Sequence, residues 1–282
     1  MKPNEILRVF PRRTKATPVD DAAFIGDPPL WLADDQVRTV HVSCTFTWDK
    51  PEAERLVGAW RFRFPRADVL LGGPAYGDPG REFVPGMYLR EGYTITSRGC
   101  PNRCERCLVP TREGGLRLLP IRDGWDVLDN NLLAALDLPN GKEHLAEVFA
   151  MLRRQPRRAR FTGGLEARRL TWELANEILG VGPDRIFLAY DSDGVWEEVR
   201  RAVGLIRHLS GWSKGSLRHH VSCYVLVGFP GDTVRRAERR IQKVIAMSVR
   251  AYPMFYRDEH YSRLPPEWHD LVGGVLAMGG AR

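Results

Sequence analysis

Hydrophobic and polar residues recur with two different periods along most of this chain, and the change of period marks the expected elements. Short runs rich in β-branched and aromatic residues, such as 184–191 and 219–227, predict strands. Longer stretches with apolar residues three and four positions apart, such as 143–154 and 195–209, predict helices. From Tyr93 onward six strand units alternate with helical or loop segments. This alternation predicts a parallel sheet with helices packed outside it.

The strand candidates in this region end in polar or glycine residues, which are typical of turns. Pro253 within the last candidate favours a strand at the edge of the sheet. Thr171 stands where an N-cap is expected, directly before a helix. The strand candidates are 92–97, 125–131, 158–164, 184–191, 219–227 and 249–256.

Before residue 92, a strand, a helix and a second strand follow one another at 37–42, 51–64 and 67–74. A unit of this size predicts a parallel pair of strands joined by a right-handed crossover. Residues 1–36 contain many prolines and predict an extended, loop-rich lead-in. We expect three side chains to anchor this lead-in to the body of the protein: Phe24, Leu30 and Trp31.

The composition is that of an ordinary globular protein, with 282 residues of which 43% are hydrophobic and 27% charged. No apolar run is long enough to span a bilayer, and the first residues lack the apolar core of a signal peptide. We therefore expect a cytoplasmic protein with no membrane partner, in which thiols stay reduced. The net charge of +7 is compatible with a nucleic-acid partner and equally with a solvated arginine-rich surface.

Three of the five cysteines, Cys100, Cys104 and Cys107, form a CxxxCxxC pattern within one loop. Thiolates are soft ligands that select zinc, copper(I) or iron–sulfur clusters. Four cysteines would saturate a structural zinc ion, whereas three leave one corner of an iron–sulfur cubane open to another ligand. Gly99 and Pro101 break the preceding strand and let the loop fold back on itself.

Other interpretations of these cysteines stay open from the residues alone. The loop is compatible with a redox pair formed by Cys104 and Cys107, with three unrelated buried cysteines, or with a zinc site completed from elsewhere. The candidate fourth zinc ligands are Cys44, Cys223, His219 and His220. The competing function is a zinc-stabilised protein that binds nucleic acid through a basic face. That face would consist of Arg153, Arg154, Arg157, Arg158, Arg235, Arg236, Arg239 and Arg240.

The strand followed by CxxxCxxC resembles the cluster loop of the radical S-adenosylmethionine (SAM) enzymes. The phrase Thr-Ser-Arg-Gly-Cys-Pro-Asn-Arg-Cys, at 96–104, is similar to members with a cobalamin-binding-like domain in front of the barrel. The resemblance implies an α/β fold, namely a partial (βα)6 TIM-type barrel with a small N-terminal βαβ extension. The expected segments are a lead-in at 1–36, a reduced βαβ extension at 37–91, the barrel at 92–258 and a C-terminal tail at 259–282.

The resemblance also implies two cofactors, a [4Fe-4S] cluster held by the three cysteines and SAM bound to its fourth iron. Reductive cleavage of SAM would give methionine and a 5′-deoxyadenosyl radical, which abstracts hydrogen from an unidentified substrate. A one-electron donor such as flavodoxin or ferredoxin is then a partner. Bound cobalamin is not expected, because no Asp-x-His-x-x-Gly segment is present. The two remaining cysteines are too few for a second all-cysteine cubane.

Sites in βα barrels lie at the carboxyl ends of the strands, so the residues there are candidates for binding SAM. The stretch 225–233 resembles the Gly-Leu-Pro-Gly-Glu-Thr segment of the family, with Asp232 in place of Glu. Arg106 stands where the family usually has an aromatic residue, and its backbone is expected near the adenine. The expected SAM-binding residues are Arg106, Asp129, Asn130, Asn131, Glu166, Arg168, Tyr190, Asp191, Val227, Gly228 and Phe229.

Several of these residues also have a simpler structural interpretation. The run 129–131 is compatible with an Asx turn, Glu166 and Arg168 with a surface ion pair, and 191–194 with a plain turn. The side chains expected to face the reacting carbon are Tyr252, Tyr256 and His219, and Cys223 is expected in the core.

Overall fold

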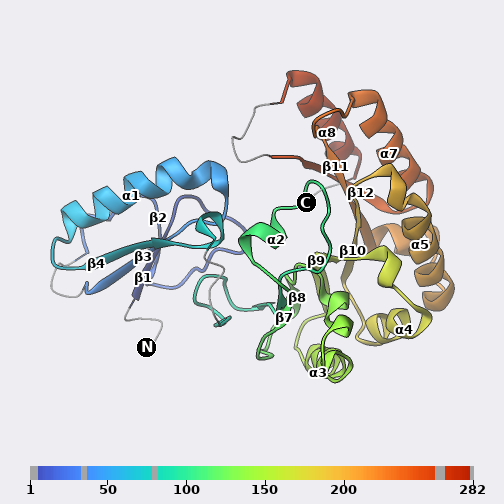
Figure 1. Ribbon diagram of the computed structural model, residues 1–282, viewed down its shortest axis with the longest axis horizontal. Helices are drawn as coiled ribbons and strands as arrows, with labels where there is room; N and C mark the ends of the chain where they lie inside the picture. The colour runs from blue at the N-terminus through green and yellow to red at the C-terminus, as the bar shows by residue number, and fades with distance from the viewer. Residues whose placement is uncertain (1–5, 33–36, 78–81, 258–263, 280–282) are drawn as a thin grey trace. The chain divides into compact units, whose positions relative to one another are not determined.

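The computed structural model of the chain describes residues 6–32, 37–77, 82–257 and 264–279 (Figure 1). Contacts divide the chain into two compact units, Met1–Gly124 and Trp125–Arg282. Both units are built on parallel strands with helices, which confirms the predicted α/β class. None of the helices in the described ranges combines the length and the apolar character that crossing a bilayer requires.

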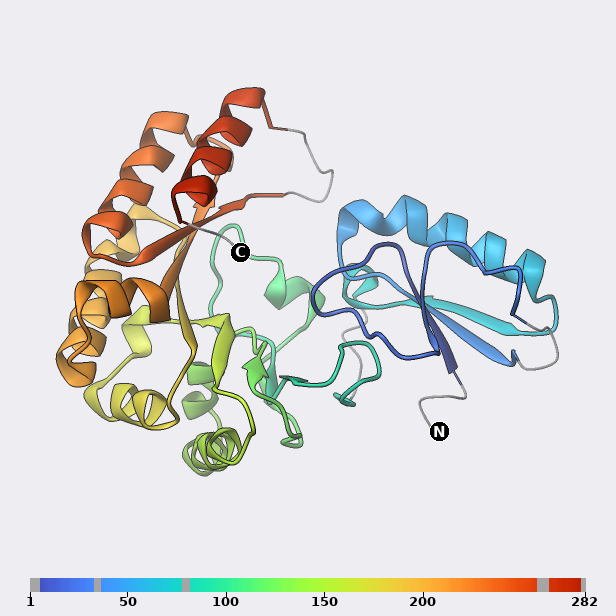
Figure 2. The same ribbon diagram turned by 180° about the vertical axis from the view of Figure 1, so that it is seen from behind.

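The first unit is organised around a parallel sheet and one long helix. Its elements are β1 (Ile6–Phe10), β2 (Ala23–Ile25), β3 (Thr39–Ser43), α1 (Lys50–Arg63), β4 (Asp68–Gly72), β5 (Tyr93–Thr94), β6 (Ser97–Arg98), α2 (Val109–Arg112) and β7 (Arg117–Leu118). The sheet has the order β2-β1-β3-β4, and α1 runs along one face of it (Figures 1 and 2). Val42, Leu56 and Trp60 share its buried core. The predicted parallel unit β3–α1–β4 is therefore confirmed.

Strand β1 corrects the expectation of a loop-rich lead-in, because it lies between β2 and β3 in the sheet. Arg8 interrupts the apolar pattern of β1, yet its side chain is fully buried. Its guanidinium donates to the carbonyls of Gly86 at 2.8 Å and Met87 at 2.9 Å and pairs with Asp20. These partners are distant in sequence or hidden in a loop, so the local pattern does not reveal the strand.

The expected anchors of the lead-in are only partly confirmed. Phe24 packs against Trp60, with ring centroids 5.4 Å apart, and so ties β2 to α1. Leu30 is 92% exposed, so the expectation that it anchors the segment is wrong, whereas the Trp31 ring is 75% exposed but contacts Phe24 with centroids 6.2 Å apart. Pro28 and Pro29 precede them in a loop that leaves the sheet after β2, which carries both side chains outward.

The second unit alternates strands and helices, as the sequence predicts. Its elements are β8 (Asp126–Val127), α3 (Gly141–Arg153), β9 (Arg160–Leu165), α4 (Trp172–Gly180), β10 (Arg185–Tyr190), α5 (Trp196–Ser210), α6 (Lys214–His220), β11 (Val221–Val227), α7 (Val234–Ala246), β12 (Arg250–Phe255) and α8 (Pro266–Gly279). Parallel neighbours follow the order β12-β11-β10-β9-β8, and helices lie along the outer side of the sheet (Figures 1 and 2). In β11, Cys223 and Val225 are fully buried, whereas Tyr224 and Leu226 are partly buried. One face of this strand is therefore packed, and the other keeps solvent access.

Several local predictions for this unit are confirmed and two need correction. The Thr171 hydroxyl accepts from the Leu174 amide as the N-cap of α4, and β12 with Pro253 forms the edge of the sheet. Residues 214–220 form helix α6, capped by Ser213, so His219 is not part of a strand. Part of the expected C-terminal tail forms α8, which packs against β12.

Candidate functional site

The cysteine loop is closed at its base by an antiparallel pair of strands. Strands β6 and β7 pair Ser97 with Leu118, directly before and after the loop. Gly99 adopts a φ of +81°, and a Cβ there would overlap the backbone of Gly115 on the opposite side of the loop. Only glycine meets both requirements, because it tolerates positive φ and lets two backbones approach closely. The chain is therefore pinned immediately before Cys100.

A second tie holds the far side of the loop. The Arg98 Nη1 donates to both carboxylate oxygens of Glu113 at 3.1 Å, and the two side chains are only 15% and 11% exposed. Arg117 adds a bond to the Glu113 carbonyl at 2.7 Å. Glu113 directly follows α2, so this cluster fixes the helix that closes the loop to the strands that open it. Charge-assisted bonds with little solvent access hold geometry well.

The three loop cysteines are more accessible than the two cysteines outside the loop. Cys104 is exposed and Cys100 and Cys107 are half-buried, whereas Cys44 and Cys223 are buried. The Cys107 amide donates to the Cys104 carbonyl at 3.0 Å, which forms a tight turn between them. Three accessible thiols on one pinned loop fit the donor set that a three-cysteine iron–sulfur cluster requires. A cubane binds each cysteine on a separate iron atom, so it does not require the sulfurs to be in contact.

The two cysteines outside the loop have the properties of core residues. Burial, followed by the nearby Asp49 charge, raises the pKa of the Cys44 thiol to about 11. Burial, followed by the Asp191 charge, also raises the pKa of Cys223. Both thiols therefore stay protonated at neutral pH and are poor metal ligands in this state. The prediction that Cys223 lies in the core is confirmed.

Among the predicted SAM-binding residues, the structure brings Asn131, Glu166 and Arg168 together after β8 and β9. The Asn131 amide donates to Glu166 at 2.6 Å, and Arg168 pairs with the same carboxylate. Arg169, which the sequence analysis did not single out, donates to Glu166 at 2.7 Å and to Asp137 at 2.7 and 2.8 Å. Its hydrogen bonds lower the pKa of Asp137. Glu166 is thus the centre of a polar group at the strand ends.

The other residues near these strand ends differ in accessibility. Asp129 is buried and Asn130 half-buried, directly after β8. Tyr190 is fully buried, and its hydroxyl donates to Asp193 at 3.1 Å. Asp191 keeps solvent access, although desolvation by the surrounding protein raises the pKa of its carboxyl. Arg106, in the cysteine loop, pairs with the adjacent Glu105 at 3.1 Å.

The turn after β11 is fixed by a buried ion pair. Asp232 accepts from the Gly228 amide at 3.1 Å and pairs with Arg240 at 2.6 Å. Arg240 also donates to the Leu226 carbonyl at 3.0 Å and lies over the Phe229 ring. Gly228 has a φ of +75°, a backbone conformation that favours glycine. The backbone at 227–229 is therefore held rigidly in place.

Arg240 corrects one assignment to the basic outer face, because its side chain is only 2% exposed. The helical spacing of the sequence already indicates a buried position for Arg240. Arg240 lies three residues after Ala237 and four before Val244, and these two apolar residues are buried on the inner face of α7. The run of arginines in α7 predicts an outer position for all of them, whereas this spacing predicts an inner position for Arg240.

The candidates for facing a substrate separate to opposite ends of their strands. Tyr256 follows β12, and its amide donates to the Val227 carbonyl at 2.8 Å, at the carboxyl end of β11. Tyr252 lies within β12 and is 37% exposed. His219 lies in α6, directly before the amino end of β11, and so away from the carboxyl end near Tyr256.

A comparison with known protein families finds no matching family model, and a comparison with curated proteins finds no match. The function is therefore argued from the residues of this chain and from the resemblance of its cysteine loop.

Proposed function

We propose that this chain is a radical SAM enzyme that binds one [4Fe-4S] cluster through Cys100, Cys104 and Cys107. When bound, such a cluster supplies the single electron that cleaves SAM reductively to methionine and a 5′-deoxyadenosyl radical. The observation that carries the proposal is the CxxxCxxC loop, with its accessible thiols and its pinned base. The loop would keep three thiolates on one side of the metal site and leave the remaining position to SAM.

The residues at the strand ends would bind and orient SAM. Carboxylate and amide oxygens of Glu166 and Asn131 can accept from the SAM ammonium, while Arg168 can pair with its carboxylate. Asp191 keeps the solvent access needed to accept from ribose hydroxyls. The rigid backbone at 227–229 would lie beside the adenine, and the Asp232–Arg240 pair would fix its position. Position and exclusion of water are the protein's contributions in such enzymes.

The proposal includes a partial (βα)6 barrel, in which the strand before the cysteine loop is the first of six. Strands β8 to β12, with their parallel order and outer helices, support this arrangement. The sheet of the first unit would be a reduced cobalamin-binding-like extension without bound cobalamin. The protein would act in the cytoplasm on an unidentified substrate with a one-electron donor such as flavodoxin or ferredoxin.

Anaerobic reconstitution followed by iron analysis tests the proposal. The wild-type chain is expected to bind about four irons and to form 5′-deoxyadenosine when given SAM and dithionite. Cys104→Ala is expected to lose both properties while keeping the fold, and Cys44→Ala, which removes a buried thiol, is expected to keep both. Stoichiometric zinc with no 5′-deoxyadenosine would overturn the proposal. Steep salt-dependent binding of RNA or DNA by that zinc form would favour the nucleic-acid-binding alternative.

Two glycine variants test whether the base of the loop matters. Gly99→Ala introduces a side chain at positive φ and against the Gly115 backbone, at a cost of about 1–3 kcal/mol or more. Iron content is expected to fall well below half of the wild-type value because the loop no longer closes. Gly115→Ala is the matched control, because its Cβ would meet no atom within 4 Å. Equal iron binding by both variants would contradict the role given to Gly99.

A further inference from the structure

Three arginines lie at the amino ends of the strands in the second unit, opposite to the proposed SAM site. Arg160 begins β9, Arg185 begins β10 and Arg250 begins β12. The strand register pairs Arg185 with Arg160 and Arg250 with Ser222 of β11. Ser222 also pairs with Phe187, which lies two residues after Arg185 on β10. Because paired residues in a parallel sheet project to the same face, these side chains share one face.

These arginines differ in their partners. Arg160 lies 3.7 Å from Asp126 and 3.6 Å from Asp184. In the described part of the chain, no hydrogen bond or ion pair joins the guanidinium of Arg185 or Arg250 to another group, although both side chains are half-buried. Partial burial weakens the hydration of a cation, and both guanidinium groups keep donors that no group of the described chain accepts. These donors are available to a ligand.

Ser222 adds an independent observation at the same place. It is 1% exposed, and its hydroxyl has no hydrogen-bond partner among the described residues. The buried Nε of the neighbouring Arg250 is also unsatisfied. Most buried polar atoms in native proteins have a partner, and an exception often marks a bound water or ion. Neighbouring residues of β11 and β12 thus carry buried donors that no acceptor of the described chain satisfies.

The charges around this place favour an anion over a cation. Burial, followed by the charge of Arg250, lowers the pKa of Arg185. Desolvation, followed by the charge of Arg185, lowers the pKa of His219, to which Arg250 also contributes. The charges of the neighbouring arginines therefore oppose further positive charge, although the Asp184 carboxylate acts in the opposite direction.

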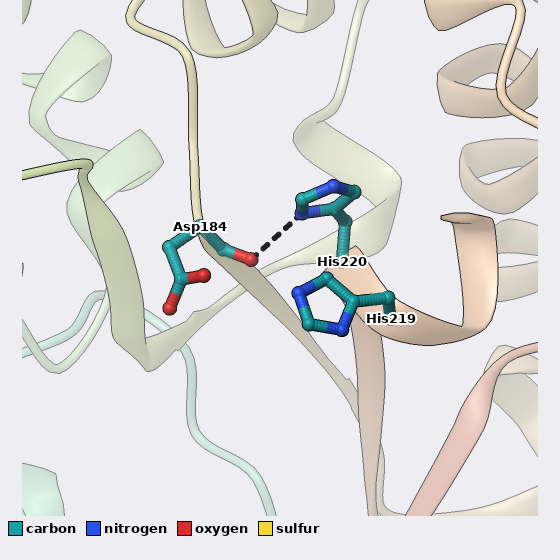
Figure 3. Close-up of side chains that lie close together, drawn as sticks. All are labelled: Asp184, His219 and His220. Atoms are coloured by element: carbon teal, nitrogen blue, oxygen red, sulfur yellow. Dashed lines mark hydrogen bonds between the residues drawn. The ribbon is translucent and has the colours of Figure 1, made fainter. Parts of the chain in front are cut away.

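A metal ion is the main competing occupant, because Asp184, His219 and His220 offer ligand atoms within 4.8 Å of one another (Figure 3). The His220 Nδ1 is already hydrogen-bonded to the Asp184 carbonyl oxygen at 2.9 Å, and its ring stacks on Trp212. A metal at that nitrogen would replace this hydrogen bond. It would also meet the same field that favours neutral His219, so a divalent cation is disfavoured here.

We propose that Arg185, Ser222 and Arg250 form a binding site for a phosphate-type oxyanion. Guanidinium groups bind phosphate oxygens through paired, charge-assisted hydrogen bonds, and the serine hydroxyl donates one more. Such an anion would neutralise the two arginines and satisfy the Ser222 hydroxyl at once. Its source is either free phosphate or the phosphate group of a small ester. This site does not depend on the proposed radical chemistry.

Phosphate binding to the full chain tests the proposal, whether or not a cluster is bound. Inorganic phosphate and adenosine monophosphate are titrated by calorimetry in chloride buffer at constant ionic strength. We expect a dissociation constant of about 1 mM or tighter for at least one of them. Tighter binding of inorganic phosphate identifies the free ion as the ligand, and tighter binding of the nucleotide identifies an ester. No binding of either probe up to 20 times that concentration overturns the proposal.

Substitutions locate the binding and separate it from a structural role. Arg250→Gln is expected to weaken binding about tenfold and Ser222→Ala about fivefold, because each removes a donor. Arg200→Gln is the matched control, since Arg200 is exposed on α5 and paired with Glu197. A dissociation constant that is unchanged in Arg250→Gln, or that rises equally in Arg200→Gln, overturns the site.

The direction in which Arg250→Gln shifts the unfolding temperature distinguishes a ligand site from a structural contact. Without phosphate, Arg250→Gln is expected to unfold no earlier than the wild type, because the substitution removes repulsion with Arg185. With 10 mM phosphate, the wild type should gain about 3 °C and Arg250→Gln, with its tenfold weaker binding, only about 1 °C. Destabilisation by Arg250→Gln in chloride, with no phosphate effect on the wild type, contradicts the proposal. Stabilisation by zinc that is lost in His219→Gln would assign the site to a metal instead.

Discussion

The arginines at the two ends of the parallel strands in the second unit differ in whether a carboxylate pairs with them. At the carboxyl ends, Arg168 and Arg169 pair with Glu166, and Arg240 pairs with Asp232. At the amino ends, Arg185 and Arg250 have no such carboxylate in the described chain. Matched charges hold a backbone in a defined geometry, and unmatched charges indicate that a ligand completes the site. The first pattern suits a rigid cofactor surface, and the second suits an anion site.

The largest loss of stability is expected at the buried ion pair between Asp232 and Arg240. Asp232→Asn leaves Arg240 in the interior without its carboxylate, so the free energy of unfolding should fall by about 3–5 kcal/mol. Urea unfolding measures this change. The control Glu238→Gln alters an exposed residue of α7, the helix that carries Arg240. Its free energy of unfolding should stay within about 0.5 kcal/mol of the wild-type value. A loss below about 1 kcal/mol in Asp232→Asn would remove the distinction between the two ends.

An intermediate loss of stability is expected at Glu166, which pairs with two partly exposed arginines. Glu166→Gln keeps an acceptor for Asn131 but removes the charge shared by Arg168 and Arg169, at a cost of about 1–2 kcal/mol. It should also weaken SAM binding, which calorimetry with the cluster-loaded protein measures. Glu177→Gln breaks a more exposed pair on the helices and should cost at most about 0.5 kcal/mol, with SAM binding unchanged. Equal losses of unfolding free energy in both variants would show that Glu166 stabilises the fold no more than an exposed ion pair does.

A smaller effect with a defined pH dependence is expected at Asp191. Desolvation raises the pKa of its carboxyl in the folded chain, so ionisation above the unfolded value near 3.8 lowers stability. Asp191→Asn should therefore be slightly more stable than the wild type at pH 7, and the difference should vanish as the pH falls below about 3.8. Unfolding midpoints measured across this range test the sign. A less stable variant at pH 7 would show that the charged carboxylate has a favourable partner.

The sequence was most informative where structure depends on neighbouring residues. The Thr171 cap, the alternation of strands and helices and the edge strand with Pro253 follow from local pattern and are confirmed. The cysteine spacing is likewise local, and it indicated a metal site without any structure. The Gly99–Gly115 approach is not local, because it joins the two ends of the loop. It explains why a glycine stands next to the first cysteine.

The features that the sequence analysis missed depend on partners far along the chain. Arg8 is compatible with a central strand only because two carbonyls and Asp20 satisfy its guanidinium. Arg240 is compatible with the core only because its guanidinium pairs with Asp232, in the turn after β11. Helix α6, capped by Ser213, takes up residues 214–220, so His219 belongs to a helix and not to the start of the predicted strand. Arg8 and Arg240 are thus buried by specific partners rather than by their own preference.

The central claim, that the cysteine loop binds a cluster with one position left for SAM, is tested most directly by electron paramagnetic resonance. The anaerobically reconstituted protein is reduced with dithionite, and its spectrum is recorded before and after SAM is added. We predict a reduced [4Fe-4S] signal whose shape changes on addition of SAM and is absent in Cys104→Ala. A signal that SAM leaves unchanged, or a protein that takes up zinc and no iron, would contradict the account.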